Sequence, residues 1–361
     1  APPASPPARD DAVTPAERAA RILQATLAAR ARAIAWREQQ IDQLAALLEA
    51  LQAEFGAEID RLALPDGTIP ISNIDALNRF IEMRMNAFDT AFQRLLLDGL
   101  RTSVGMGVGV IGAVPVTADA AAAEALRFVR EFTGADGLQL SDRLWRAGQG
   151  TRQVVREQIL GAIARGQAAS TSALELIAGG KPLLIDTTSA MEAGTAKNLK
   201  ELVRRSLTAS ENSQRFIYER VLRTEMNRAF TEAFVGAGAL DDDVVGVRFE
   251  LSPLHPRVDV CDMHAQANLH GLGAGVYPLT AHPYPAHPQT LSFLTYVFAD
   301  EITENDRNGR QSAFEWIRSQ PQNTQVGVLG GQRKQRAFAA GELQEGELRA
   351  TWAVVRQRLG R

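Results

Sequence analysis

An uninterrupted helical period near the N-terminus restricts the fold more than any other feature. Apolar residues recur every seven positions, at Leu27, Ile34, Ile41, Leu48, Phe55 and Leu62. No proline interrupts this stretch after Pro15, which stands at a first helical position that proline tolerates. Thr14 and Glu17 have the spacing of a capping box. We therefore expect a single long helix over most of 14–62.

A second helical period, over about 72–100, follows the turn sequence LPDGTIP at 64–70. Two long helices joined by a short turn predict an antiparallel hairpin. Charged residues interrupt the second seam of the first helix, namely Arg30, Arg37 and Glu58. The interruptions favour packing within the chain over a coiled coil with a partner. Association with a partner is expected to depend on this hairpin, with Ile34, Ile41 and Leu48 as the docking surface.

Composition excludes several classes of protein and site. The chain has 361 residues and a formal net charge of −3, so it lacks the overall basic charge typical of nonspecific nucleic-acid binding. Its single cysteine cannot form an intrachain disulfide. No stretch reaches the ~18 apolar residues of a membrane span. The Pro/Ala-rich lead, 1–13, has no signal-peptide core and is expected to be disordered.

The hydrophobic period changes from helical to alternating at Val244. Before that point, the Gly-rich segment at 102–116 indicates a linker. Shorter helices are expected at about 118–133, 141–147, 151–165, 172–178, 195–207 and 211–235, with Gly166 and Gly179 as C-terminal caps. Strands are expected at 244–251 and 293–298, and helices near 311–319 and over 341–358.

These elements predict a mainly α protein with a small antiparallel β element. The expected organisation is a disordered lead (1–13), a long helical hairpin with a Gly-rich linker (14–117), a helical part (118–243), a small β and His/Cys loop domain (244–300) and a C-terminal helical tail (301–361).

All five histidines and the only cysteine lie between the two expected strands: His255, Cys261, His264, His270, His282 and His287. The Cys-x2-His and His-x4-His spacings suit a tetrahedral zinc ion, with Asp259 and Asp262 orienting the ligands. A network of His/Asp hydrogen bonds is the alternative. A loop this long, without a helix or strand of its own, needs an internal tie. We expect His255, Cys261 and His287 to converge, with His264 close by.

The patterns of common enzymes are missing. The chain has no His-Glu-x-x-His zinc motif, and no nucleophile-elbow sequence surrounds Cys261. The glycines at 271, 273 and 275 neither follow a strand directly nor open a helix, so they indicate a turn with positive φ rather than a phosphate loop. Arg223-Thr224-Glu225 lies on a helix, where Arg223 and Glu225 are expected to anchor that helix to the loop domain.

The order of residues in this window resembles the phage minor head proteins, the Mu F-type head morphogenesis family. The elements that carry the resemblance are Leu251-Ser252, His255-Pro256, Asp259-Val260-Cys261-Asp262, Gly271 to Pro278 and Pro285-Ala286-His287-Pro288. Upstream, LQLSDRLWR and Arg223-Thr224-Glu225 with Ala229 are similar to helices of the same family. The resemblance spans about 138–300.

The resemblance implies a non-enzymatic virion component that takes part in procapsid assembly and associates with the portal or the capsid interior. The implied partners are portal, major capsid or scaffold proteins, with packaged DNA as a further contact and no membrane. The implied locations are the virion and, during assembly, the host cytoplasm.

The resemblance also bears on the metal. It supports the fold and the role more than the metal: if a structural zinc is bound, the candidate ligands are His255, Cys261, His264 and His287, whereas His282 has no counterpart in the family. Thr290 and Ser292 stand where family members carry cysteines, and neither hydroxyl is a usual zinc ligand. This departure favours the hydrogen-bond network slightly over a complete zinc site.

Two other functions stay open. The first is a metal-dependent hydrolase or nuclease that uses the His/Cys/Asp cluster to activate a water molecule. The second, a toxin-like effector, has less support because no effector domain is evident. Removal of the metal separates a structural ion from a catalytic one, because the former supports stability and the latter supports turnover.

Overall fold

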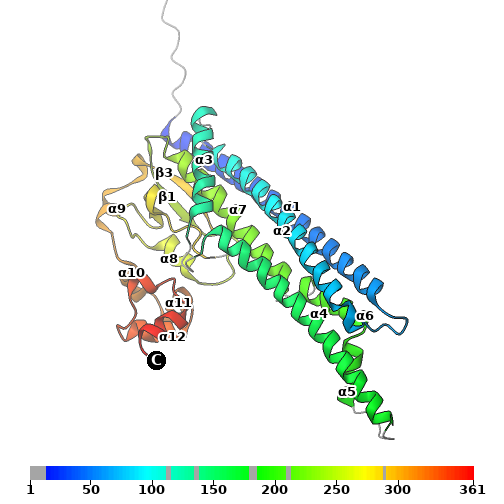
Figure 1. The fold of residues 1–361 in the computed structure, drawn as a ribbon. Helices are drawn as coiled ribbons and strands as arrows, with labels where there is room; N and C mark the ends of the chain where they lie inside the picture. The colour runs from blue at the N-terminus through cyan, green and yellow to red at the C-terminus, as the bar shows by residue number, and fades with distance from the viewer. Residues whose placement is uncertain (1–13, 111–114, 134–137, 179–184, 209–212, 288–289) are drawn as a thin grey trace, which may run out of the picture. The chain divides into compact units, whose positions relative to one another are not determined.

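The computed structural model describes residues 14–110, 115–133, 138–178, 185–208, 213–287 and 290–361 (Figure 1). It confirms the predicted class, mainly α with one small antiparallel sheet. The expected disordered lead, 1–13, and Gly179 lie outside the described residues. Among the helices described, none is long and apolar enough to cross a membrane.

The two long N-terminal helices form as predicted. Helix α1 spans Pro15–Leu62 and begins at the Thr14 and Glu17 capping box, in which the Glu17 amide donates to Thr14 Oγ1 at 3.3 Å. The chain turns and passes through a short 3-10 helix, η1 (Ile71–Asn73), before α2 spans Ile74–Val108. Phe55 of α1 and Phe80 of α2 meet edge to face, so the two helices pack against each other within this region.

The helices that follow are α3 (Pro115–Glu131), α4 (Leu140–Ala178), α5 (Ile185–Ala193), α6 (Ala196–Leu207) and α7 (Gln214–Gly238). Of these helices, α3, α6 and α7 lie close to their predicted bounds, α4 joins three predicted helices into one, and α5 was not predicted. The predicted break at Gly166 is wrong, because Gly166 lies buried inside α4. A Cβ at this position would stand 3.0 Å from the Gly194 Cα, so the glycine permits close backbone approach instead of ending the helix.

Residues 102–108 of the Gly-rich segment are helix rather than linker, which corrects the prediction there, whereas 111–114 lie outside the described residues. Helix α2 continues to Val108 and buries Val104 and Val108. A Cβ at Gly107 would stand 2.3 Å from the Phe230 carbonyl oxygen of α7. Glycine here lets two helices approach closely, and that contact outweighs its poor helix propensity.

The sheet has three antiparallel strands in the order β2-β1-β3. Strands β1 (Val244–Glu250) and β3 (Phe293–Phe298) confirm the prediction, and Phe249 pairs with Leu294 in their register. The short strand β2 (Val276–Tyr277) was not predicted. It pairs with β1 through Val247 and Tyr277, so the loop between β1 and β3 is itself tied to the sheet.

The chain forms two compact units that combine segments distant in the sequence. Unit 1 comprises 1–34, 102–129 and 227–361, and unit 2 comprises 35–101 and 130–226. The prediction instead divided the chain into consecutive domains. Helices α1, α2 and α7 each contribute residues to both units.

The N-terminal seam contributes to the interior of unit 2. Ile41, Leu48 and Phe55 are buried, together with Leu44 and Leu51 of the second seam. The preference for packing within the chain is thereby supported. Of the residues in the predicted docking surface, Ile41 and Leu48 are buried within the chain, whereas Ile34 is half-buried.

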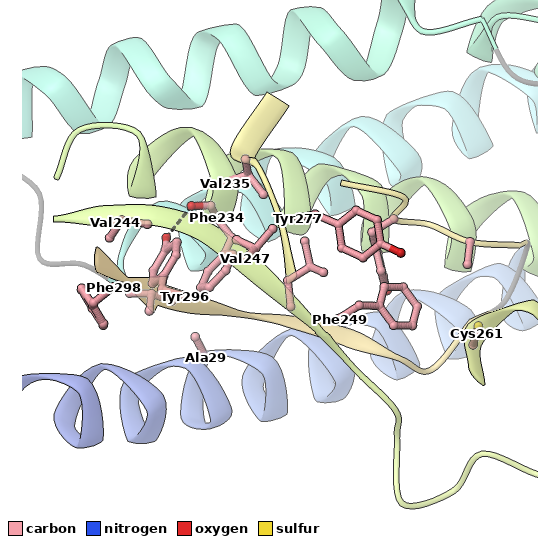
Figure 2. Packing of buried hydrophobic residues seen from close by; sticks show 14 residues of the cluster. Ala29, Phe234, Val235, Val244, Val247, Phe249, Cys261, Tyr277, Tyr296 and Phe298 are labelled. Carbon is pink, nitrogen blue, oxygen red and sulfur yellow. Dashed lines mark hydrogen bonds between the residues drawn. The ribbon is translucent and has the colours of Figure 1, made fainter. Parts of the chain in front are cut away.

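In unit 1 the sheet packs with α1 and α7 (Figure 2). Phe234 of α7 stacks on Tyr296 of β3 with ring centroids 3.9 Å apart, and the Tyr296 hydroxyl donates to the Phe234 carbonyl oxygen. Ala29 of α1 and Val247 of β1 belong to the same buried cluster. The sheet is therefore a fixed frame for the loop that β1 and β3 delimit.

The C-terminal region forms several short helices, so the expected single helix over 341–358 is wrong. They are η3 (Ala299–Glu301), α9 (Glu304–Asn308), α10 (Ala313–Ser319), α11 (Gln322–Val328), α12 (Gln332–Ala339), η4 (Glu345–Glu347) and α13 (Trp352–Arg358). Gly341, at φ 73°, follows the C-terminal end of α12 and separates it from η4. Trp316, Ile317 and Phe338 form a core with Met263 of the loop.

Candidate functional site

The loop between β1 and β3 is more ordered than the sequence predicts. It contains a helix, α8 (Val260–Gln266), the strand β2 and a short 3-10 helix, η2 (Leu279–Ala281). Asp259 caps α8, because its Oδ1 accepts a hydrogen bond from the Cys261 amide at 2.7 Å. Asp262 completes the capping box by accepting from the Asp259 amide at 2.8 Å.

Asp259 is the centre of the candidate site. His287 Nε2 lies 3.3 Å from Asp259 Oδ2, and His255 Nε2 lies 3.9 Å from Asp259 Oδ1. Burial would raise the pKa of Asp259. The hydrogen bonds from His287 and from the Cys261 amide outweigh burial and lower the pKa to about 2. Asp259 is therefore an anion that joins the start of α8 to the end of the loop.

His255 binds the other acid of the capping box. Its Nε2 lies 2.9 Å from Asp262 Oδ2, the same oxygen that accepts from the Asp259 amide. The side chains of both residues are largely buried. The predicted network of histidines and aspartates thus exists, and it is built on the cap of α8.

His264 is buried and is held by the sheet. Its Nδ1 lies 2.8 Å from the hydroxyl of Tyr277 in β2, and its ring tilts against Phe249 of β1. Burial, with a smaller contribution from the charge of Arg349, lowers the pKa of His264 to about 3. The imidazole is therefore neutral at physiological pH. Its Nε2 is buried and has no hydrogen-bond partner among the described residues.

The structure brings together only part of the predicted ligand set. Asp259, Cys261 and His287 offer ligand atoms within 4.8 Å of one another, and so do His255, Asp259 and Asp262. Cys261 and His287 converge as expected. His255 lies in the second group and His264 in neither, which corrects the predicted set of four. Asp259, assigned only an orienting role from the sequence, belongs to both groups.

His282, the weaker candidate, lies elsewhere. Its Nε2 is 3.7 Å from Glu232 Oε2 of α7, and it belongs to neither group of candidate ligands. Thr290, at a position where the resemblance implies a cysteine, does lie beside Cys261. Its Oγ1 is 3.6 Å from the Cys261 sulfur, and both side chains are buried.

The group of three has the chemistry of a zinc site. Zinc binds cysteine sulfur, histidine nitrogen and carboxylate oxygen, and Asp259, Cys261 and His287 supply one of each. The same residues also contact one another, because Asp259 Oδ2 lies 3.3 Å from His287 Nε2 and Asp259 Oδ1 accepts from the Cys261 amide. The residues therefore fit a three-ligand metal site, and they equally fit a closed hydrogen-bond network.

The glycines of the loop form turns, as predicted. Gly271, Gly273 and Gly275 all have positive φ. The Asn268 carboxamide accepts from the Gly271 amide at 2.8 Å, and a Cβ at Gly275 would stand 2.5 Å from the Ala265 carbonyl oxygen. These contacts fold the loop back on α8 and leave no phosphate-binding arrangement among these residues.

Arg349 is a structural residue of the site that sequence reasoning missed. Its Nη2 donates to the carbonyl oxygens of Pro283, Pro285 and Ala286, at 3.1, 2.6 and 2.8 Å. Burial lowers its pKa. The arginine ties the C-terminal helices to the segment that carries His287. Nothing in the sequence around Arg349 indicates this contact, because the partners are backbone oxygens far away in the chain.

The contacts of Arg223 and Glu225 seen among the described residues anchor α7 to helices of unit 2. Arg223 binds Glu38 of α1 at 2.9 Å, and Glu225 binds Arg143 of α4 at 2.8 Å. All four residues belong to unit 2. Both residues anchor α7, as predicted. The partners among the described residues are Glu38 and Arg143 of unit 2, whereas the prediction named the loop domain.

Unit 2 also contains a cavity of about 600 Å³. Its apolar wall includes Phe92 and Trp145, and its polar groups include Asp89 and Arg152, which form an ion pair at 2.7 Å. No residue of the His/Cys loop lines this cavity.

Comparisons with models of protein families, with curated proteins and with solved structures find no match to this chain.

Proposed function

We propose that the chain is a phage minor head protein that acts in capsid assembly without catalysing a reaction. The proposal starts from the resemblance of 138–300 to the Mu F-type head morphogenesis proteins. The residues of the His/Cys window that carry the resemblance belong to unit 1, in β1, α8, the glycine turns and the segment before β3. The upstream residues that carry it, LQLSDRLWR and Arg223-Thr224-Glu225, belong to unit 2.

One observation carries the non-enzymatic assignment. Several polar side chains of the loop contact other groups of the same module. Asp259 contacts His287 and caps α8, His255 contacts Asp262, and His264 Nδ1 contacts the Tyr277 hydroxyl. Such pairing holds together a segment that has few large apolar residues. A catalytic acid or base instead needs to reach a substrate proton. The cluster thus serves the folding of the loop, and a bound zinc would serve the same purpose.

The partners that follow from this proposal are the portal protein and the major capsid or scaffold proteins. The protein would be located in the virion and, before that, in the host cytoplasm where procapsids assemble. Packaged DNA is a further contact. Ile41 and Leu48 are buried, so these two residues do not supply the docking surface for the partners.

Affinity capture with the full chain as bait tests the proposal. Portal and scaffold proteins from the same source are offered together, and the expected result is retention of the portal or the scaffold at physiological salt. Retention of neither protein, together with no incorporation of the chain into particles assembled in its presence, would refute the proposed role.

A metal-dependent hydrolase or nuclease is the second candidate, and the zinc-compatible group of Asp259, Cys261 and His287 favours it. Hydrolysis of a nucleic acid or a peptide by the purified chain with added zinc, abolished by EDTA and by Asp259→Asn, would establish this candidate. We expect no such turnover, because the same three residues hold the loop together.

A further inference from the structure

Charge is unevenly distributed along the chain. Residues 311–361 contain eight Lys and Arg against four Asp and Glu, whereas residues 1–310 contain 31 against 38. The near-neutral total therefore conceals a basic C-terminal segment. Binding to a polyanion depends on such a local surplus and not on the net charge of the whole chain.

Each of the four carboxylates of this segment forms an ion pair or a hydrogen bond within the segment. Glu342 pairs with Arg361, and Glu347 pairs with Arg358. Glu315 accepts from the Ser312 amide at 2.7 Å and thereby caps α10. Glu345 accepts from the Phe314 amide at 3.4 Å. These contacts hold the short helices together.

Most of the cations of the segment also have a structural task. Lys334 and Arg349 donate to backbone carbonyl oxygens, and Arg318 stacks over Phe314 and Phe338. Two exposed arginines of α12, Arg333 and Arg336, have no acidic partner within the described residues. They are three positions apart, so both lie on one face of the helix. The opposite face buries Lys334, Ala337 and Phe338.

Helices α10, α11 and α12 have the order of a helix-turn-helix module (red in Figure 1). Only Leu329, Gly330 and Gly331 separate α11 from α12, and both glycines have positive φ. A Cβ at either glycine would meet nothing within 4 Å, so the glycines are needed for the turn and not for close packing. Trp316, Val328 and Phe338 form the core of the three helices.

We propose that this module binds double-stranded DNA through the exposed face of α12. In helix-turn-helix proteins the second helix of the motif lies in the major groove, and flanking residues contact phosphates. Helix α12 has eight residues, and an α-helix with its side chains is about 10–12 Å across, which fits a major groove about 12 Å wide. Arg333 and Arg336 contact phosphates, so the binding is electrostatic and sensitive to salt. The inference stands on the C-terminal helices alone and holds whether or not the chain is a head protein.

Fluorescence anisotropy with the full chain and a labelled 25-base-pair duplex of mixed sequence tests the proposal between 50 and 200 mM NaCl. We expect binding that weakens with salt, with a nonspecific Kd of about 10⁻⁴–10⁻⁶ M at physiological salt. The double variant Arg333→Gln/Arg336→Gln should lower the slope of log K against log salt by roughly 2 and weaken binding at every salt concentration. The control is Arg79→Gln, which removes an exposed arginine of α2 and should leave the slope unchanged.

Both arginines are exposed, so circular dichroism should show the same melting temperature for the double variant and the wild type. Three results would overturn the proposal: no binding of the duplex at 50 mM NaCl, an unchanged slope in the double variant, or an equal loss in the Arg79→Gln control. Binding of poly-glutamate in preference to the duplex would also overturn it, because the face would then fit an acidic protein surface. None of these results bears on capture of the portal or scaffold.

Discussion

At the residue scale, the sequence predicts which side chains gather but not which of them pair. The grouping of Cys261 and His287 follows from two strands that hold both ends of one loop, and strands are visible in the sequence as alternation. The central role of Asp259 depends on where α8 begins. Seven residues are too short for a helical period to appear, so the cap could not be located in advance.

The burial of His264 predicts a pH dependence of stability. Its pKa falls from 6.5 in the unfolded chain to about 3 in the folded protein, and Arg349, Asp259 and His287 are the charged groups that act on it. Between these values the unfolded chain binds the additional proton, so stability falls as the pH is lowered. Urea unfolding at intervals from pH 6.5 to 4.5 should show a loss approaching about 1.4 kcal/mol per pH unit.

The variant His264→Gln should flatten this dependence, whereas His282→Gln, a change at the histidine beside Glu232, should preserve it. A slope that is the same in the wild type and in His264→Gln would show that another group governs stability in this range.

Asp259 offers a second prediction at this scale, because one residue serves both as cap and as candidate ligand. Replacement by Ala removes the cap of α8 and should cost about 0.5–2 kcal/mol or more in unfolding free energy. Replacement by Asn keeps an acceptor for the Cys261 amide and should recover much of the cap contribution. Thermal melting of both variants, with zinc and with EDTA, is the measurement.

If zinc is bound, EDTA should lower the melting temperature of the wild type and have a much smaller effect on Asp259→Asn. If the network acts alone, EDTA should change neither protein. A melting temperature of Asp259→Ala equal to that of the wild type would show that the cluster does not stabilise the loop.

At the element scale, hydrophobic periodicity correctly predicted the long helices and both main strands. The predictions that were based on glycine, a linker at 102–108 and a helix end at Gly166, were wrong. The segment after Arg101 contains enough glycine to indicate a linker, yet Gly107 lets α2 pass close to α7. Local propensity cannot reveal such a contact, because the partner lies more than a hundred residues away. For the same reason, Gly166 was assigned to a helix end although it packs inside α4.

A pair of glycines in one helix tests this account. Gly107→Ala places a methyl group 2.3 Å from the Phe230 carbonyl oxygen, and overpacking of this kind costs about 1–3 kcal/mol. Gly105→Ala, two residues earlier, meets nothing within 4 Å and should be neutral or stabilising by up to about 1 kcal/mol. Chemical unfolding of both variants is the measurement. Equal stabilities would mean that α2 and α7 do not approach as closely as described.

The anchoring of α7 gives a second test at this scale. Glu225 is buried and binds Arg143, whose side chain is 16% exposed. Glu225→Gln removes the carboxylate that Arg143 binds in this pair. The cost should lie near the lower end of the roughly 3–5 kcal/mol typical of broken buried pairs, since Arg143 can still reach water. Glu201→Gln, which breaks the exposed pair with Arg204, should cost about 0–1 kcal/mol.

A comparable loss of unfolding free energy in Glu225→Gln and Glu201→Gln would contradict the anchoring role of the buried pair.

At the scale of the whole molecule, the class of fold could be predicted and the grouping of segments could not. Hydrophobic period fixes the type of each long element, and so a mainly α chain with a small sheet follows from the sequence. The two compact units instead combine segments from both halves of the chain. Which segments share a core depends on contacts such as Phe234 with Tyr296, and these leave no trace in local sequence.

The central claim is that the His/Cys loop serves folding and, through folding, particle assembly. The most direct test is to measure thermal stability and incorporation into particles together for His287→Ala, in cells that express the portal, scaffold and major capsid proteins from the same source. The account predicts that both fall together, because His287 is paired with Asp259 at the cap of α8. A variant that melts like the wild type and yet fails to enter particles would contradict the account and make the cluster a functional site.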